Sequence, residues 1–171
     1  MFYPDRHFSS IYDITPEILS GDGVRALVLD IDNTLVSYQT ERPDKSVSEW
    51  INKMRGAGVG ITIASNNNRR RVERFCEGLD VFFTYKSAKP LPKCIRLSCK
   101  KFGIGKREVA VVGDQIFTDV LCAKFGGARA YLVDPIDGRE SRFIRFKRLL
   151  EKPIISSYKK RHPAEFLEDG K

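Results

Sequence analysis

Short apolar segments alternate with longer amphipathic segments along most of the chain. The apolar segments are rich in Val, Ile and Leu and lie at residues 25–31, 59–65, 81–85, 108–114 and 128–134. Their apolar residues follow one another without regular polar interruptions, which is typical of strands buried on both faces of a sheet. We therefore predict five strands in the interior of the molecule.

The longer segments between these strands have the periodicity of helices and lie at residues 46–58, 67–79, 91–103 and 115–127. At the start of the first, Ser46 is followed three residues later by Glu49, the pattern of a capping box. Because strands and helices alternate with short links, we expect parallel strands joined by crossover helices. The predicted fold class is α/β, a doubly wound, five-stranded parallel sheet in a Rossmann-like three-layer sandwich, with its core at residues 20–135.

Length and composition favour one packed domain spanning residues 1–171, with 42% apolar and 30% charged residues. No apolar run approaches the ~20 residues that a membrane-spanning helix needs, and the first residues do not resemble a secretory signal. We therefore expect a cytoplasmic protein. The four cysteines are irregularly spaced, which favours reduced thiols over a metal site.

The positive charge is concentrated near the end of the sequence. The net charge is +8, and the segment from Arg139 to Arg161 contains nine basic residues and two acidic ones. Such a distribution suggests an anionic partner, which could be nucleic acid, an anionic membrane or a phosphorylated substrate. A solvated surface helix would have the same composition. The arginines within residues 69–74 leave the same two alternatives open.

Polar residues that can carry chemistry follow the predicted strands. Asp30 and Asp32 come after the first strand, Ser65 ends the second, Lys89 lies just beyond the third, and Asp114 ends the fourth. Because the carboxyl ends of parallel strands meet at one edge of a sheet, we expect these side chains to lie close together. A buried carboxylate needs a partner, and a cation would supply one, while the lysine and serine suit an anion.

Four short motifs occur in a fixed order at these strand ends. Asp30–Thr34 reads D-x-D-x-T, Ser65 ends "ITIAS", Lys89 lies in "SAKP", and Gly113–Asp119 reads G-D-x-x-x-x-D. This set resembles the motifs of the haloacid dehalogenase-like (HAD) phosphohydrolase superfamily. Over residues 3–150 the chain is similar to subfamily IIIA, the YqeG-type phosphatases, which include phosphatidylglycerophosphate phosphatases.

The resemblance implies a role for each motif residue. Asp30 would be the nucleophile that forms an aspartyl-phosphate, and Asp32 would be the general acid and then the general base. Ser65 and Lys89 would bind the phosphate, and Asn66 would add a further contact to it.

The resemblance also implies that Mg²⁺ is the cofactor. The metal would be held by the carboxylates of Asp30 and Asp114 and by the backbone carbonyl of Asp32. Thr34 and Asp119 would support the site, and Asp119 is expected to orient Lys89 or a metal-bound water.

The spacing of the motifs leaves no room for a large cap domain. Ser65 follows Asp30 by 35 residues and Lys89 follows Ser65 by 24, which the predicted helices fill. An open site suits a large or surface-displayed substrate. The resemblance implies magnesium-dependent conversion of phosphatidylglycerophosphate to phosphatidylglycerol. Nucleic-acid, nucleotide or protein phosphates remain alternatives, as does a non-catalytic module that binds anionic ligands. Nucleic acid is disfavoured because aromatic residues for base stacking are not interleaved with the motifs.

A basic amphipathic helix is predicted at residues 139–152. Phe143, Phe146 and Leu150 fall on one face, beside a row formed by Arg139, Arg142, Arg145 and Arg148. Such a helix can lie peripherally at the inner face of a membrane and bind anionic phospholipid. Packing onto the domain core is favoured for the aromatic residues. After Pro153 the pattern weakens, and we expect a loose tail.

Overall fold

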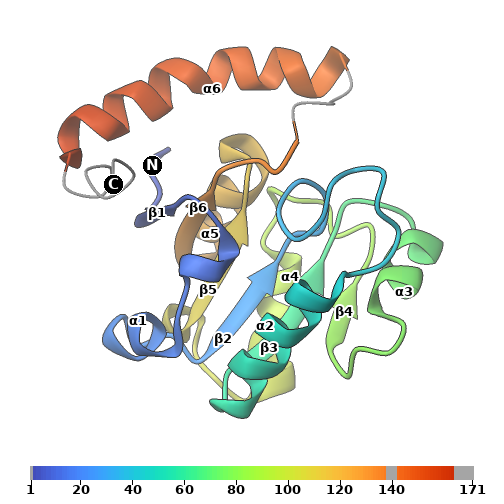
Figure 1. Cartoon of the computed structure of the whole chain (residues 1–171). Helices are drawn as coiled ribbons and strands as arrows, with labels where there is room; N and C mark the ends of the chain where they lie inside the picture. The colour runs from blue at the N-terminus through green and yellow to red at the C-terminus, as the bar shows by residue number, and fades with distance from the viewer. Residues whose placement is uncertain (1, 138–141, 164–171) are drawn as a thin grey trace.

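The computed structural model describes residues 2–137 and 142–163, with the side chains of Arg142 and Phe143 excepted. Its strands form one parallel sheet in the order β1-β6-β5-β2-β3-β4 (Figure 1). The six strands are β1 (Arg6–Phe8), β2 (Ala26–Leu29), β3 (Gly60–Ala64), β4 (Phe82–Thr84), β5 (Val109–Gly113) and β6 (Arg129–Val133). The α/β parallel fold is therefore confirmed.

The prediction of five strands is wrong by one, because β1 adds a sixth at the edge of the sheet. β1 has three residues, and only His7 among them is buried, so the sequence offers no apolar run there. Two long-range contacts hold the strand in place. β1 pairs with β6, and the Nε2 atom of His7 lies 2.8 Å from an Asp134 carboxylate oxygen just beyond β6.

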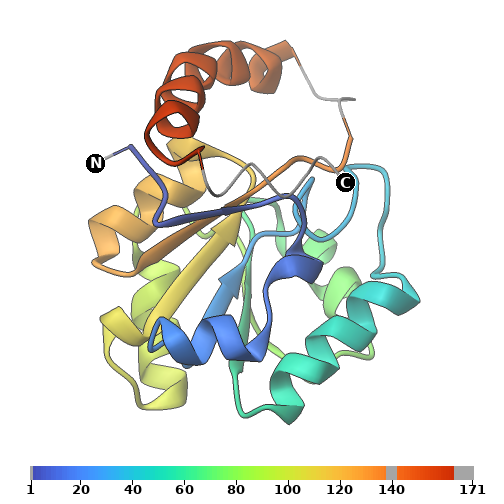
Figure 2. The ribbon, with the colours of Figure 1, turned by 60° about the vertical axis from the view of Figure 1, so that its left-hand side comes forward.

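Helices cover both faces of the sheet (Figures 1 and 2). They are α1 (Pro16–Gly21), α2 (Lys45–Gly56), α3 (Arg69–Cys76), α4 (Lys93–Phe102), α5 (Leu121–Gly126) and α6 (Arg142–Arg161), with a π-helix, η3 (Ile116–Val120), before α5 and two short 3-10 helices, η1 (Ile11–Asp13) and η2 (Lys106–Glu108). The segment predicted as a helix at 115–127 is thus divided between η3 and α5. Between β2 and β4 the chain forms only α2, β3 and α3 with their connecting loops, so no large cap is present there.

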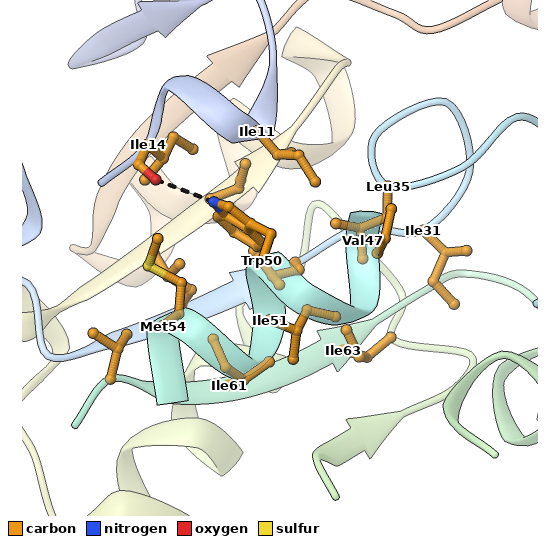
Figure 3. Close-up of a cluster of buried hydrophobic side chains, with 14 of the residues drawn as sticks. Ile11, Ile14, Ile31, Leu35, Val47, Trp50, Ile51, Met54, Ile61 and Ile63 are labelled. Atoms are coloured by element: carbon orange, nitrogen blue, oxygen red, sulfur yellow. Dashed lines mark hydrogen bonds between the residues drawn. The ribbon is translucent and has the colours of Figure 1, made fainter. Parts of the chain in front are cut away.

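Successive side chains of each strand point to opposite faces of the sheet, so two apolar cores form, one on each face. Leu27 and Leu29 of β2 point into a core with α1, α2 and α3, whereas Ala26 and Val28 point into a core with α4 and α5. Figure 3 shows the centre of the first core, where Trp50 of α2 donates a hydrogen bond from Nε1 to the Ile14 carbonyl at 3.1 Å. This three-layer packing fixes the strand ends that carry the predicted site.

The start of α2 differs from the capping box expected at Ser46. Asp44 is the cap, and its side chain accepts a hydrogen bond from the backbone of Val47 at 2.8 Å. Aspartate and serine serve equally well in this position, so the local sequence does not distinguish the two starts.

Helix α6 lies across the carboxyl end of the sheet in both views (Figures 1 and 2). It continues through Pro153 to Arg161, so the predicted end near residue 152 and the loose tail directly after it are wrong. Burial of Glu151 and Tyr158, and packing of Ile154 on the second core, hold both sides of the proline in place despite its local cost.

The outer side of α6 also differs from expectation. Packing onto the core is predicted for the aromatic residue Phe146, but its side chain is 61% exposed, and Leu150 on the same face is 49% exposed. Arg139 and the side chains of Arg142 and Phe143 lie outside the described part of the structure. Among the described residues, no helix is both long enough and apolar enough to cross a membrane.

Candidate active site

The carboxyl ends of β2, β3 and β5 bring the predicted site residues together. Asp30 follows β2, and its backbone N–H donates to the Val112 carbonyl of β5 at 3.0 Å. The Lys89 ammonium donates to Asp30 Oδ1 at 2.6 Å and to Asp119 Oδ1 at 2.7 Å. All three side chains are buried. The expected contact between Asp119 and Lys89 is therefore present.

Asn66 holds the backbone of Lys89. The Asn66 side-chain oxygen accepts from the Lys89 N–H at 2.8 Å, and its amide nitrogen donates to the Lys89 carbonyl at 3.1 Å. The contact predicted between Asn66 and phosphate stays a prediction. The structure shows instead that Asn66 positions the backbone of Lys89 through these two hydrogen bonds.

The glycine of the fourth motif makes room for Asp119. A Cβ atom placed on Gly113 would lie 2.2 Å from the Asp119 Cγ, closer than non-bonded atoms can approach. The same carboxylate accepts from the Gln115 backbone N–H at 3.2 Å. The π-helix η3 thus turns Asp119 back over the end of β5, where it reaches the lysine.

Asp114 is held by residues from two distant segments. The Thr34 hydroxyl donates to Asp114 Oδ1 at 3.2 Å, while the supporting role predicted for Thr34 stays a prediction. The Arg148 guanidinium of α6 contacts both the carboxylate and the backbone carbonyl of Asp114. Glu151 lies 3.6 Å from Arg148 and accepts from the Phe117 N–H at 3.0 Å, which ties α6 to η3. Sequence reasoning missed Arg148, which it placed only in a basic row.

Asp32 is oriented by two residues that were not predicted to belong to the site. Its carboxylate accepts from the Asn67 amide at 2.7 Å and from the Arg71 guanidinium at 3.0 Å. Arg71 also donates to the carbonyls of Thr40 and Glu41. Asn67 and Asn68 are both predicted to start the helix at residues 67–79, and the structure confirms this for Asn68, which caps α3. Nothing in the local pattern indicates these contacts, which join segments far apart in the sequence.

A cavity of about 280 Å³ lies over these groups. Its lining comprises Asp30, Asp32, Tyr38, Ser65, Asn66, Asn67, Lys89, Gln115, Thr118, Ile144 and Lys147. Ser65 Oγ accepts from the Asn67 N–H at 3.0 Å, which leaves its hydrogen to donate. A larger cavity of about 580 Å³, lined by Arg25 and Phe102 among others, contains none of the predicted site residues.

Burial and neighbouring charges shift the pKa values of Asp30, Asp114 and Lys89. Burial raises the pKa of Asp30 to about 8, although Lys89 opposes the rise. The carboxylates of Asp119 and Asp114 add to it. Burial also raises the pKa of Asp114 to about 6, against the effect of Arg148. For Lys89, burial lowers the pKa, but its two ion pairs outweigh burial and raise the pKa overall.

The acidic groups fit a divalent cation. Carboxylate oxygens of Asp30, Asp114 and Asp119 lie within 4.8 Å of one another, and Mg²⁺ prefers oxygen ligands. Asp32 is absent from this cluster of described side chains, so its backbone carbonyl remains the group expected to contact a metal. Because Asp119 already binds Lys89 and the Gln115 N–H, it is the least available of the three.

Comparison with known proteins agrees with these observations. A model of the haloacid dehalogenase-like hydrolases matches residues 37–127. The chain is also 36% identical, over 160 residues, to Probable phosphatase YqeG of Bacillus subtilis (strain 168), a match that covers 94% of this chain and 93% of that protein. The chain belongs to the haloacid dehalogenase-like hydrolases. The predicted family and the similarity to YqeG are thus confirmed.

Solved structures show the same fold as this HAD-like hydrolase. An uncharacterized protein from Listeria monocytogenes serotype 4b has a TM-score of 0.53 and 17% identity, and the match covers 69% of this chain and 85% of that one. The cobalt-bound deoxy-D-mannose-octulosonate 8-phosphate phosphatase of Haemophilus influenzae has a TM-score of 0.54 and 12% identity, with coverage of 74% and 75%. At such identities the likeness concerns the fold alone.

Proposed function

We propose that this HAD-like hydrolase is a magnesium-dependent phosphomonoesterase that dephosphorylates phosphatidylglycerophosphate to phosphatidylglycerol. The observation that carries the proposal is the buried contact between Asp30 and Lys89 at 2.6 Å, on the floor of a cavity beside two further carboxylates. A carboxylate and an ammonium so placed provide a nucleophile and a group that binds the anion it attacks.

The proposed chemistry gives these side chains the roles that the family resemblance implies. A carboxylate oxygen of Asp30 forms a bond to phosphorus while the bond from phosphorus to the alcohol oxygen breaks, and Asp32 gives its proton to that oxygen. Water then attacks the aspartyl-phosphate, Asp32 takes the water proton, and the bond to Asp30 breaks. Lys89 and Ser65 bind the phosphoryl oxygens through both steps.

Mg²⁺ would be held by the carboxylates of Asp30 and Asp114 and the backbone carbonyl of Asp32. When bound, it supplies positive charge that neutralises the phosphate and the crowded carboxylates. Asp119 acts through Lys89, whose ammonium it holds at 2.7 Å.

Support for the lipid substrate comes from the cavity and its neighbours. The described residues form no large cap over the site, and Lys147 of α6 adds a basic group at its wall. The buried Oε1 atom of Gln115, another lining residue, has no hydrogen-bond partner among the described residues. A hydroxyl close to the phosphate would satisfy this acceptor, and the terminal glycerol of phosphatidylglycerophosphate carries one.

The test is phosphate release with Mg²⁺ from phosphatidylglycerophosphate in mixed micelles, beside a 3′-phosphorylated oligonucleotide and an aryl phosphate. We expect fast release from the lipid and its loss in Asp30→Asn. Gln115→Leu should lower kcat/KM for the lipid by up to about tenfold while changing aryl phosphate hydrolysis little, since the lipid hydroxyl would lose a hydrogen bond worth roughly 0.5–1.5 kcal/mol.

Each result decides between the alternatives. Release from the aryl phosphate alone would retain the chemistry and refute the lipid substrate. Release from the oligonucleotide in preference to the lipid would favour a nucleic-acid phosphatase. No release from any substrate, in a protein that still binds phosphate, would favour a non-catalytic binding module.

A further inference from the structure

An apolar ridge runs along the side of α6 that faces away from the rest of the chain. Phe146, Leu149, Leu150 and Pro153 are all exposed, and Phe146 and Leu149 reach 61% and 65%. Their spacing of i, i+3, i+4 and i+7 places them on one helical face. In Figures 1 and 2 one side of α6 faces the sheet and the other faces away from the rest of the chain. These apolar side chains therefore do not pack on the rest of the domain.

The ridge is a second apolar face of α6, because other side chains of the helix already pack against the domain. Glu151 and Tyr158 are buried on the inner face, and Ile154 and Ile155 pack on the second core. The Tyr3 hydroxyl, near the start of the chain, lies 2.7 Å from the Ser157 hydroxyl and fixes the helix further. Rotating α6 to bury the ridge would break these contacts, so the ridge stays outside.

Charge identifies the kind of partner. Every exposed charged side chain that the structure describes on α6 is basic, namely Arg145, Lys152, Lys159, Lys160 and Arg161. The acidic residue of the helix, Glu151, is fully buried. Basic side chains attract an anionic surface, and an apolar ridge beside them can enter an acyl-chain boundary but has no counterpart on a polyanion such as nucleic acid. The combination matches a bilayer that contains anionic lipid.

We infer that α6 is a membrane-docking helix that lies in the interface of an anionic bilayer with the ridge Phe146, Leu149, Leu150 and Pro153 inserted. The same helix contributes Ile144 and Lys147 to the wall of the catalytic cavity. Docking therefore holds the cavity roughly one helix diameter, about 10 Å, from the lipid headgroups. The inference does not depend on the proposed substrate.

The test is flotation of the full chain with extruded vesicles that contain no phosphorylated substrate. Vesicles of phosphatidylcholine with phosphatidylserine are compared with phosphatidylcholine alone, in chelator and in low salt. We expect the wild type to bind the anionic vesicles and the double variant Phe146→Ser/Leu149→Ser to partition at least tenfold more weakly. Phe125→Ser, which changes a 51% exposed phenylalanine on α5, should stay within twofold of the wild type.

Two further measurements keep the result interpretable. Thermal unfolding of each variant shows that the fold is intact, and sedimentation velocity without lipid reports the oligomeric state. The inference is overturned if the wild type binds neutral and anionic vesicles equally, or if the folded double variant floats like the wild type. It is also overturned if the ridge variant converts a dimer to a monomer, because the ridge would then join two copies. Vesicle binding without phosphatase activity would refute the proposed function alone.

Discussion

Replacing Asp30 by asparagine is expected to stabilise the metal-free protein while removing its activity. Burial raises the pKa of this carboxyl from 3.8 to about 8. At pH 7 the Asp30 carboxyl is ionised in the unfolded chain, which lowers the free energy of that state. In most native molecules without metal the same carboxyl is protonated. Since only the range from pH 3.8 to pH 7 counts at pH 7, and each pKa unit is worth about 1.4 kcal/mol, the raised pKa of Asp30 destabilises the native state by roughly 4 kcal/mol at most.

Asparagine cannot ionise in either state, so the difference disappears. Part of the gain is lost with the contact to Lys89, and we expect a net stabilisation of about 2 kcal/mol, or a rise in Tm of roughly 4–8 °C. The assay is urea and thermal unfolding in chelator. Glu49→Gln is the matched control, because Glu49 is an exposed carboxylate on α2 whose side chain is 67% accessible.

The pH dependence gives the sign of the effect. Between about pH 4 and pH 8 the native state of Asp30 binds more protons than the unfolded state, so its contribution to stability falls as pH rises. Asp114, whose pKa is raised to about 6, adds a slope of the same sign, so the quantity to measure is the difference between wild type and Asp30→Asn. The reasoning fails if the variant is less stable than the wild type in chelator at pH 7, or if that difference does not grow with pH.

Three other predictions concern the site and the core. Gly113→Ala should destabilise the protein by about 1–3 kcal/mol and reduce activity, because its Cβ would clash with Asp119, whereas Gly56→Ala, with nothing within 4 Å, should not. Urea unfolding and phosphate release measure both effects, and equal behaviour of the two variants would contradict the role of Gly113. Trp50→Phe should cost roughly 1–3 kcal/mol, since the Ile14 carbonyl loses its donor, and an unchanged urea midpoint would argue against that bond. Chelation with EDTA should abolish phosphate release and excess Mg²⁺ should restore it, and release that persists in chelator would show that the reaction needs no metal.

Local pattern predicts most of this sheet because its central strands are buried on both faces. Strands β2 and β5 are continuous apolar runs, so their composition alone reveals them. β1 is different, since two of its three residues are not buried and only pairing with β6 makes it a strand. The continuation of α6 past Pro153 likewise depends on tertiary contacts, which outweigh the local effect of proline.

The same distinction applies to the site. Residues that lie at strand ends, such as Asp30 and Ser65, are visible in the sequence because strand position and residue type agree. Arg71 and Arg148 are not, because a basic residue on a helix looks like any solvated one until the fold brings it to a buried carboxylate. Electrostatic partners that come from separate helices are therefore the part of this site that only a structure reveals.

The position of α6 has a consequence for synthesis of the chain. All six strands have been made once β6 has been synthesised, but two residues of the site follow β6 in the sequence. Lys147 lines the cavity, and Arg148 binds Asp114. At translation rates of about 5–20 residues per second, these residues are added roughly one to three seconds later. During that interval Asp114 lacks the guanidinium that partners it in the finished protein. The last helix can therefore dock only after every strand of the sheet has been made, and the site reaches its final charge balance only when that helix docks.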